Sequence, residues 1–353
     1  MSISEIRKKI DAIDEKIVGL LNERAQETSA IGKLKMKRRQ SIYAPARESE
    51  ILSKIAKTAR GPLKPEALVA IYNEIMSASR ALEKSLRIAY MGPEATFSHL
   101  AALKKFGSMV EYVPYNSISD VFREVEKDNA DYGVVPIENS IEGAVSHTLD
   151  MLVDADLKIC SQLLLDISHN LLARCAKKNI KRVYSNPQVF GQCRIWLEAN
   201  LPKTDLIEVS STTRAAQIAS RERSSACIAS LLAAKKYGLN VVARGIEDSP
   251  HNITRFLVIG KYESEPSGRD KTSIMFSIKD RVGALHDMLV PFKKYKINLT
   301  KIESRPSKKR AWDYFFFVDL KGHVADPRLK KALRELQDKC KFLKVLGSYP
   351  ETE

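Results

Sequence analysis

The stretch 251–256 holds the clearest candidates for chemistry in this chain of 353 residues. Within it, Thr254 and Arg255 place a hydroxyl beside a guanidinium, and the apolar run 257–259 behind them predicts a buried strand. A hydroxyl that handles a proton beside a fixed cation suits a small substrate that bears carboxylates. Asn252 and Thr254 are equally typical of an ordinary turn, so the stretch alone leaves both interpretations open.

Four other turns repeat these residue types. Each follows a predicted strand, and all but the one at Asn139 lead into a helix. Their side chains are Thr96 and Ser98; Asn139 and Ser140; Ser185, Gln188 and Gln192; and Ser211 and Thr212. Strands that alternate with helices predict α/β sheets, which gather ligand groups at the carboxyl ends of their strands. One such turn is typical of helix capping. Four of them together with Thr254 favour a binding site.

The order of these motifs over residues 87–262 resembles the prephenate dehydratase family. The matching motifs are Gly92-Pro93 with Thr96-Phe97-Ser98, Pro136-Ile137-Glu138-Asn139-Ser140 with Glu142-Gly143, Ser185 with Pro187-Gln188, and Asn252 with Thr254-Arg255-Phe256. Ala95 stands where the family usually has glycine, and Asn186 where it often has histidine. The resemblance implies two α/β lobes joined by hinge strands, as in a periplasmic binding protein, with the site between them.

The same resemblance implies roles for the cleft residues. Prephenate loses carbon dioxide and hydroxide, and Thr254 would be the acid for the departing hydroxyl or would position it. Arg255 would be the leading carboxylate clamp. The cleft would be lined by Thr96, Ser98, Asn139, Ser140, Ser185, Gln188, Gln192, Ser211, Thr212, Asn252 and Phe256. Because threonine is a weak acid in water, a hydrogen-bond network must assist it.

A second set of candidate residues interrupts a helical pattern near the N-terminus. Apolar residues recur in alternating steps of three and four at Ile3, Ile6, Ile10, Ile13, Ile17 and Leu20, and again at Ile31 and Leu34. This seam predicts a long helix that packs on a dimer partner. Arg24 and Glu27 occupy the two missing seam positions. A charge there is costly unless a ligand fills the space beside it, although an arginine can also extend to solvent.

Helix geometry adds a constraint on these charges. Two further helices are predicted to begin near Pro45 and Pro65, and the last of them carries Ser79 and Glu83 on its apolar face. Arg24 and Lys35 are 11 residues apart, so they share a helix face about 16 Å apart. Arg7 precedes Lys35 by 28 residues, about 42 Å on a straight helix, and can join the same ligand only from an antiparallel partner chain. The pattern therefore predicts a dimer with composite sites.

These three helices resemble the all-helical chorismate mutase family, through Arg7, Arg24, Lys35, Arg47, Glu48, Ser79 and Glu83. The resemblance implies that Arg24 and the partner's Arg7 grip the carboxylates of chorismate, while Lys35 and Glu83 address its ether oxygen. Arg47 would join the cationic lining, and Glu48 would bond the substrate hydroxyl. The reaction is a unimolecular rearrangement, so the site holds a compact conformer and stabilises developing charge.

Two positions depart from the chorismate mutase pattern. Ala44 stands where many relatives carry aspartate, and Glu83 where some carry glutamine. A glutamate must be protonated to donate to the ether oxygen, so the sequence predicts a mutase activity that falls as pH rises.

The C-terminal segment, beyond a linker at 263–271, predicts a ferredoxin-like βαββαβ module. Its elements are a strand at 272–278, a helix at 284–295, strands at 299–305 and 312–320, a helix at 327–339 and a strand at 342–348. With Gly283-Ala284-Leu285-His286 and Glu303-Ser304-Arg305-Pro306, it resembles the phenylalanine-binding ACT domains. The resemblance implies an L-phenylalanine site across an ACT dimer, made by Gly283, Ala284, Leu285, His286, Asn298, Leu299, Glu303, Ser304 and Arg305. A plain structural α+β module is the alternative.

Composition limits the remaining possibilities. Hydrophobic residues are 44% and charged residues 29% of the chain, which is typical of a globular protein. No apolar run is long enough for a membrane span and no signal-peptide pattern is present, so a cytoplasmic location is expected. Five scattered cysteines and six histidines without ligand spacing predict no metal site, and no cofactor is expected. The net charge of +15 favours attraction of small dianions over nucleic-acid binding.

The sequence therefore predicts a multidomain protein. It would have an all-α mutase domain at 1–86, an α/β two-lobed dehydratase domain at 87–262 and an α+β ACT domain at 272–353. The leading hypothesis is a bifunctional enzyme, a homodimer or dimer of dimers, that takes chorismate through prephenate to phenylpyruvate under feedback by L-phenylalanine. A ligand sensor that has lost one or both activities is the runner-up, and a nucleic-acid-binding regulator is third.

Overall fold

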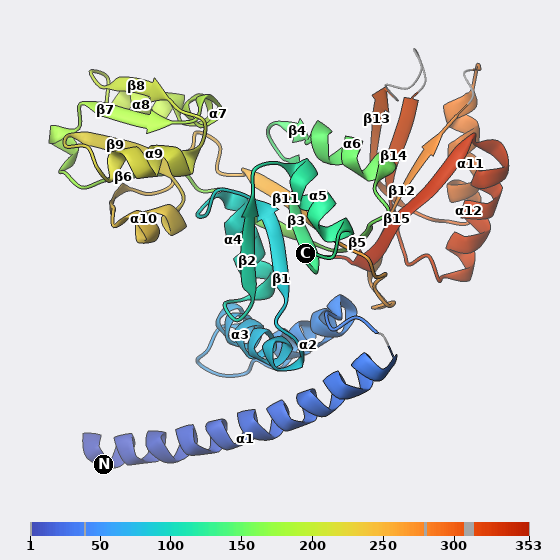
Figure 1. Ribbon diagram of the computed structural model, residues 1–353, viewed down its shortest axis with the longest axis horizontal. Coiled ribbons are helices and arrows are strands. Elements are labelled where there is room, and N and C mark those ends of the chain that lie inside the picture. Colours follow the sequence, from blue (N-terminus) through green and yellow to red (C-terminus); the bar gives the residue numbers. More distant parts are fainter. Residues whose placement is uncertain (1, 39, 279–280, 307–313, 353) are drawn as a thin grey trace. The chain divides into compact units, whose positions relative to one another are not determined.

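The computed structural model describes residues 2–38, 40–278, 281–306 and 314–352, which belong to two compact units (Figure 1). The first unit comprises residues 1–86 with 106–111, and the second comprises residues 87–105 with 112–353. Within the described ranges, no helix combines the length and apolarity that a membrane crossing requires.

The first unit is helical. Its helices are α1 (Ile3–Arg38), α2 (Pro45–Thr58) and α3 (Pro65–Glu83). α2 and α3 begin at the two prolines that the sequence indicated. Proline has no N–H to donate, and at the first position of a helix that N–H would have no partner within the helix. Every residue from Ser2 to Glu23 is exposed, and α1 becomes partly covered only from Arg24 on. The predicted apolar seam therefore lies open along the first half of α1.

The second unit contains a first lobe built on one mixed sheet. Its strands are β1 (Arg87–Met91), β2 (Glu111–Tyr115), β3 (Tyr132–Asn139), β4 (Gly143–Ala144), β5 (Lys158–Asp166) and β11 (Ile253–Gly260). The order is β2-β1-β3-β11-β5, with β4 paired to β3. Its helices are α4 (Phe97–Phe106), α5 (Ile118–Glu126) and α6 (Ser146–Asp154). β11 runs antiparallel to both neighbours, which sets Thr254 opposite Asn139 on β3 and Leu165 on β5.

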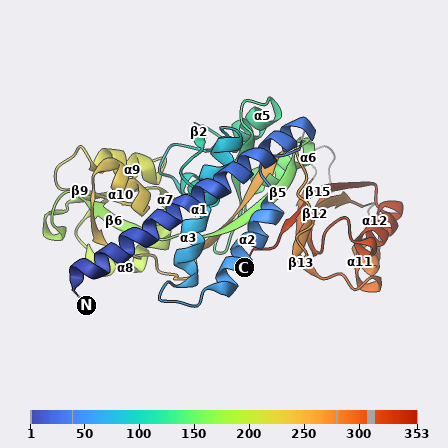
Figure 2. The same ribbon diagram turned by 90° about the horizontal axis from the view of Figure 1, so that it is seen from below.

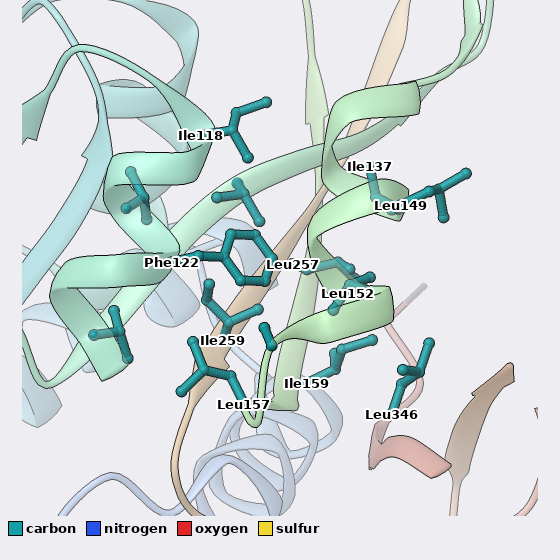
Figure 3. Packing of buried hydrophobic residues seen from close by; sticks show 14 of the residues in the cluster. Ile118, Phe122, Ile137, Leu149, Leu152, Leu157, Ile159, Leu257, Ile259 and Leu346 are labelled. Atoms are coloured by element: carbon teal, nitrogen blue, oxygen red, sulfur yellow. The ribbon is translucent and has the colours of Figure 1, made fainter. Parts of the chain in front are cut away.

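The core of this lobe lies between its helices and the sheet. α5 buries Ile118, Val121, Phe122 and Val125, the spacing of one helix face. Figure 3 shows Phe122 of α5 packed near Leu257 of β11, with Leu346 of the C-terminal module in the same cluster. The apolar run behind Thr254 is thus a buried strand, as predicted.

A second lobe carries its own sheet. Its elements are β6 (Asn170–Ala173), η1 (Lys177–Asn179), β7 (Arg182–Ser185), α7 (Pro187–Gln192), α8 (Arg194–Asn200), β8 (Asp205–Glu208), α9 (Thr212–Ala219), β9 (Ser225–Ala229), α10 (Leu231–Tyr237) and β10 (Asn240–Ala243), and the strand order is β10-β6-β9-β7-β8.

The chain crosses between the two lobes twice, at residues 167–169 and 244–252, and the crossing segments bond to each other. Ile167 N donates to Asn252 O over 2.8 Å, and Ile246 N donates to His169 O over 2.9 Å. The two segments therefore form the junction between the lobes.

The C-terminal module has the predicted βαββαβ order. Its elements are β12 (Asp270–Ser277), α11 (Ala284–Lys294), β13 (Leu299–Pro306), β14 (Tyr314–Lys321), α12 (Pro327–Lys339) and β15 (Phe342–Pro350), with the antiparallel order β13-β14-β12-β15. The predicted start of the third strand, Trp312, lies outside the described residues. The predicted all-α, two-lobed α/β and ferredoxin-like folds are confirmed.

This module packs closely on the first lobe, where β15 lies beside β5 (Figure 2). A Cβ built on Gly347 of β15 would lie 2.2 Å from the Ile159 carbonyl oxygen of β5. Only glycine fits this approach of two backbones.

Candidate active sites

Thr254 lies at the centre of a hydrogen-bond network near the junction of the two lobes. It is 8% exposed, and its Oγ1 accepts a hydrogen bond from Asn139 Nδ2 over 2.9 Å. The same amide nitrogen donates to Asn252 Oδ1 over 2.7 Å. Three of the predicted cleft residues therefore lie together.

The orientation of the Asn139 amide is fixed by the backbone. Its Oδ1 accepts hydrogen bonds from Ile141 N over 2.9 Å and from Glu142 N over 3.0 Å, and backbone N–H groups only donate. The amide nitrogen must therefore point at Thr254. Because the Thr254 oxygen accepts this bond, its own proton is free to point toward a ligand.

Gln192 extends the network into the second lobe. Its Oε1 accepts from Asn252 Nδ2 over 3.0 Å and is 2.8 Å from His169 Nε2. Its Nε2 donates to Glu142 Oε1 over 3.1 Å. One continuous set of side chains thus joins α7, both crossing segments and the end of β3.

His169 is a neutral member of this network. It is 1% exposed, and burial lowers the pKa of its imidazole below the ordinary value, an effect that Gln192 and Glu247 oppose only in part. A neutral ring has one N–H. With Nε2 donating to Gln192, Nδ1 is a buried acceptor without a partner among the described residues.

The other predicted cleft residues have separate contacts. Thr96 Oγ1 accepts from His99 N at the start of α4, and Ser211 Oγ accepts from Arg214 N at the start of α9. Ser185 is fully buried and donates to Ile228 O over 3.0 Å. Within the described part of the chain, the structure assigns no hydrogen bond to the Thr254 side chain from Thr96, Ser98, Ser140, Ser185, Gln188, Ser211, Thr212 or Phe256. Phe256 is a core residue, 2% exposed.

Arg255 lies on the other face of β11 from Thr254, because successive strand side chains point to opposite faces. Its guanidinium donates to Gln162 Oε1 over 2.8 Å, to Asp319 Oδ2 over 2.6 Å and to Tyr349 OH over 2.9 Å. The predicted pairing of Arg255 with Thr254 as a substrate clamp is therefore not supported by the geometry.

In the helical unit, four of the predicted site residues meet as two pairs between α1 and α3. Arg24 donates to Ser79 Oγ, and Lys35 Nζ lies 3.3 Å from Glu83 Oε2. Gly32 lies between them, and a Cβ there would be 2.8 Å from Glu83 Cγ. The predicted face of α1 is therefore formed.

The remaining mutase residues are placed differently. Arg7 is exposed on the open half of α1, and Arg47 pairs with Glu50 over 2.6 Å at the surface. Glu48 pairs with Arg80, which is 4% exposed and also donates to Phe106 O over 2.7 Å. Arg80 was not predicted from the sequence, and its pairing engages the carboxylate that was assigned to the substrate hydroxyl.

The C-terminal module has a hollow of about 320 Å³ at the predicted effector motif. It is lined by Ile278, Arg281, Gly283, Ala284, Leu285, His286, Tyr314 and Phe316. Gly283, with φ of 75°, begins α11 in a left-handed conformation that suits glycine.

The second effector motif does not line this hollow. Asn298, Leu299, Glu303, Ser304 and Arg305 lie on or just before the edge strand β13. Arg305 donates to Ser146 Oγ over 2.6 Å and to Asp150 Oδ1 over 3.3 Å, both on α6.

Comparison with known proteins decides the family. The sequence matches the family models for chorismate mutase type II over residues 6–84, prephenate dehydratase over 88–264 and the ACT domain over 272–338. The bifunctional chorismate mutase/prephenate dehydratase of Aquifex aeolicus (strain VF5) is 52% identical over 354 residues, which cover 99% of this chain and 98% of that one. The chain belongs to this bifunctional family.

Other chorismate mutase/prephenate dehydratases align equally fully. The protein of Stutzerimonas stutzeri is 45% identical over 356 residues, covering 99% of this chain and 98% of its own. Among solved structures, the prephenate dehydratase of Arthrobacter aurescens in complex with L-Phe is 33% identical, with a TM-score of 0.70, and covers 75% of this chain and 90% of that one.

Three polar residues that contact the candidate site residues were not predicted from the sequence. Glu142 lies inside a motif that was matched but was not assigned to the cleft, so its position was the available signal. His169 and Arg80 gave no such signal, because their roles depend on which segments lie side by side. Across the described residues, no cluster of three or more His, Cys, Asp or Glu could hold a metal ion, and Cys160, Cys193 and Cys227 are buried as free thiols.

Proposed function

We propose that this chain rearranges chorismate to prephenate in residues 1–86, converts prephenate to phenylpyruvate in residues 87–262, and responds to L-phenylalanine through residues 272–353. Family membership supports both activities. The observation that carries the dehydratase assignment is the fixed Asn139 amide, which leaves the Thr254 proton free for a substrate.

The dehydratase step needs one proton. The bond from the prephenate ring to its carboxylate breaks, and its electron pair enters the ring as carbon dioxide leaves. The ring C–O bond breaks as the hydroxyl takes a proton from Thr254 Oγ1 and departs as water, and solvent returns the proton to Thr254. Donation by Asn139 into the Thr254 oxygen polarises the O–H bond. Aromatisation supplies the driving force, so one positioned acid is sufficient.

The carboxylates of prephenate require donors other than Arg255. The starts of α4 and α9 carry the hydroxyls of Thr96, Ser98, Ser211 and Thr212, and helix N-termini present free N–H groups to anions. We assign carboxylate binding to these positions. The Arg255 guanidinium already has three partners on the opposite face of β11.

The mutase site would be completed by a second copy of the chain. Arg24 and Lys35 lie on the covered face of α1, while Arg7 is 28 residues before Lys35, about 42 Å along the helix. The apolar seam from Ile3 to Leu20 is exposed along that same segment and suits an antiparallel copy. We infer a homodimer, or a dimer of dimers, in which each site takes Arg7 from the partner.

The effector site would also need two copies. The hollow at Gly283–His286 is lined without Glu303, Ser304 or Arg305, so the two motifs would meet only across a dimer. L-phenylalanine would then inhibit the dehydratase by preferring one arrangement of the assembled domains.

The test is to incubate the full chain with chorismate, follow prephenate and phenylpyruvate, and then add L-phenylalanine. Thr254→Ala should lower dehydratase turnover by about 10²–10⁴-fold, the range for a lost general acid, because no other group then holds the proton. Mutase turnover should be unchanged in the same preparation. A normal dehydratase rate in Thr254→Ala would exclude the assignment, and Thr254→Ser should recover part of the loss.

A further inference from the structure

The Arg255 side chain ends in a buried polar cluster made by the ACT sheet. Arg255 is 11% exposed at its side chain and pairs with Asp319 of β14, which is 9% exposed, over 2.6 Å. Tyr349 of β15 accepts a second bond from it. Ser273 of β12 lies 2.5 Å from Asp319 Oδ1 and 2.6 Å from Tyr349 OH. Three adjacent ACT strands therefore hold one side chain of the dehydratase.

The surroundings of this cluster are packed and nearly dry. Leu257 of β11 shares one apolar core with Phe317 and Leu346 of the ACT sheet. The cavity that remains there is about 20 Å³, close to the smallest space that one water occupies. A packed interface transmits displacement instead of absorbing it.

The charge on Arg255 persists in this setting. Burial tends to lower the pKa of its guanidinium, but Tyr349, Asp319 and Glu138 beside it raise the pKa above the ordinary value. Separating a buried charge from its nearest carboxylate is unfavourable, so a shift of Asp319 with the ACT sheet pulls on the Arg255 guanidinium.

Arg255 is also the chain neighbour of Thr254, the proposed acid. Both belong to the regular part of β11, and the pairing with β3 becomes irregular only after Arg255. A displacement of the Arg255 backbone is therefore carried directly to Thr254 and to its bond with Asn139.

We propose that Arg255 is a positioning residue that ties the Thr254 strand to the ACT sheet through Asp319, so that the ACT domain controls dehydratase turnover through this ion pair. The inference rests on the proposed function, since it requires a dehydratase that responds to L-phenylalanine. It replaces the substrate-clamp role of Arg255 with a mechanical one.

Glu138 is a second carboxylate that can pair with Arg255 in place of Asp319. It lies opposite Arg255 on β3, with Oε2 3.8 Å from the Arg255 guanidinium and 2.8 Å from Lys301 Nζ. When Asp319 is neutral, Arg255 keeps a carboxylate partner within its own lobe. Asp319→Asn therefore removes the ion pair between Arg255 and the ACT sheet, leaving the Tyr349 bond in place, without leaving the Arg255 charge unpaired.

The experiment compares wild type, Asp319→Asn and the control Glu335→Gln as full chains. Glu335 makes an ACT ion pair with Lys294 over 2.5 Å, between α11 and α12. For each we would measure kcat and KM for prephenate, half-inhibition by L-phenylalanine, and calorimetric binding of L-phenylalanine. Asp319→Asn should still bind L-phenylalanine but need at least about tenfold more for half-inhibition, with KM changed less than about twofold. Glu335→Gln should match wild type.

Arg255→Met separates positioning from substrate binding. As a positioning residue, it should lower kcat by about 10–100-fold with KM within about twofold, and Arg255→Lys should recover part of the loss. A large rise in KM with kcat retained would identify a clamp and overturn the proposal. Wild-type inhibition in Asp319→Asn would overturn it as well.

Two further outcomes are distinguishable. If wild type lacks dehydratase turnover or does not respond to L-phenylalanine, the proposed function itself fails. If Asp319→Asn does not fold, judged by circular dichroism and thermal unfolding, Tyr349→Phe removes only one bond to Arg255 and should weaken inhibition in the same direction. Unchanged inhibition in that variant would count against the proposal.

Discussion

The proposed mutase and dehydratase sites of this chain are built from different kinds of side chain. Between α1 and α3, each pair contains at least one charged side chain: Lys35 pairs with Glu83, and Arg24 donates to Ser79. Around Thr254, the groups are mostly neutral amides, and Asn139 is oriented by two backbone N–H groups. The first site leaves Arg7 and an apolar seam exposed, whereas the second joins its members by hydrogen bonds within one chain.

This difference follows from what each scaffold can fix. A helix presents side chains along a rod, so a ligand that needs cations on several sides requires more than one rod. Strand ends and crossing segments bring backbone amides close together, and those amides orient neutral side chains without any partner chain. Mutase activity should therefore depend on assembly of two chains, and dehydratase activity on which atoms around Thr254 donate hydrogen bonds.

Changing the hydrogen-bond donor that faces Thr254 should have the largest effect on activity. In Asn139→Asp, one oxygen still accepts from Ile141 N and Glu142 N, but the other faces the Thr254 oxygen as an acceptor. Thr254 must then donate to the introduced carboxylate in place of the substrate, so dehydratase turnover should fall by about 10²–10⁴-fold. Steady-state kinetics with prephenate would measure this.

A matched control is available in the same lobe. Asn129→Asp makes the same change at an exposed amide that bonds Glu124, and it should leave turnover within about twofold. Near-normal turnover in Asn139→Asp would show that Thr254 is not held as a donor to the substrate.

Assembly should be decisive for the mutase. Arg7→Ala and Arg24→Ala should each lower mutase turnover by about 100-fold, since each removes a charged hydrogen bond to a carboxylate. Co-expressed together, they should recover about a quarter of wild-type turnover, because each mixed dimer rebuilds one of two composite sites and half the dimers are mixed.

The control for this experiment combines variants of two residues that lie on the same face of α1 in one chain. Arg24→Ala co-expressed with Lys35→Ala damages every site in the mixed dimer and should recover nothing. Recovery in that control, or its absence with Arg7→Ala, would contradict a site shared between copies.

The contrast between the two sites also explains what could be predicted from the sequence. Pro45 and Pro65 mark helix starts by local sterics, and the apolar spacing of α5 needs no tertiary information, so the elements were predicted well. Arg255 was misplaced because it was read as part of one motif with Thr254. The alternation of strand side chains separates the two residues, and that rule could have been applied to the sequence.

Other contacts could not be predicted from the sequence. His169 meets Gln192 only because two crossing segments pair, and Arg80 meets Glu48 across two helices. Such contacts depend on tertiary packing between residues far apart in the chain. A hydrogen-bond network around Thr254 was therefore predicted, but only some of the residues that form it were.

Charge in the mutase site should show itself in its pH profile. Glu83 lies 3.3 Å from Lys35 with a side chain only 6% exposed, so a carboxylate there accepts from lysine and cannot donate to an ether oxygen. The sequence predicts a mutase activity that falls as pH rises, and mutase turnover measured from pH 5 to 8 tests that prediction. Glu83→Gln, a permanent donor, should give a flat profile, and the exposed Glu50→Gln should keep the wild-type slope. A flat wild-type profile would exclude protonated Glu83 as the donor.

The smallest expected effect is a loss of folding stability at acid pH that comes from the buried imidazole of His169. Burial lowers the pKa of His169 below its ordinary value of 6.5, so below that pH the unfolded chain binds a proton that the folded chain does not. Stability should therefore be full above pH 6.5 and fall as pH drops, by at most about 1.4 kcal/mol per pH unit from this group. His99 shifts in the same direction. Thermal unfolding from pH 7.5 to 5.5 should thus show a shallower acid slope in His169→Gln than in wild type.

All six histidines follow residue 98, so this histidine-linked loss belongs to the second unit and not to the mutase helices. Dehydratase activity should therefore be lost at a lower temperature when the pH is reduced, with a smaller shift for mutase activity in the same sample. An equal shift of both activities would mean that carboxylates dominate the acid response. An unchanged slope in His169→Gln would mean that the histidine at the lobe junction is protonated as readily in the folded chain as in the unfolded one.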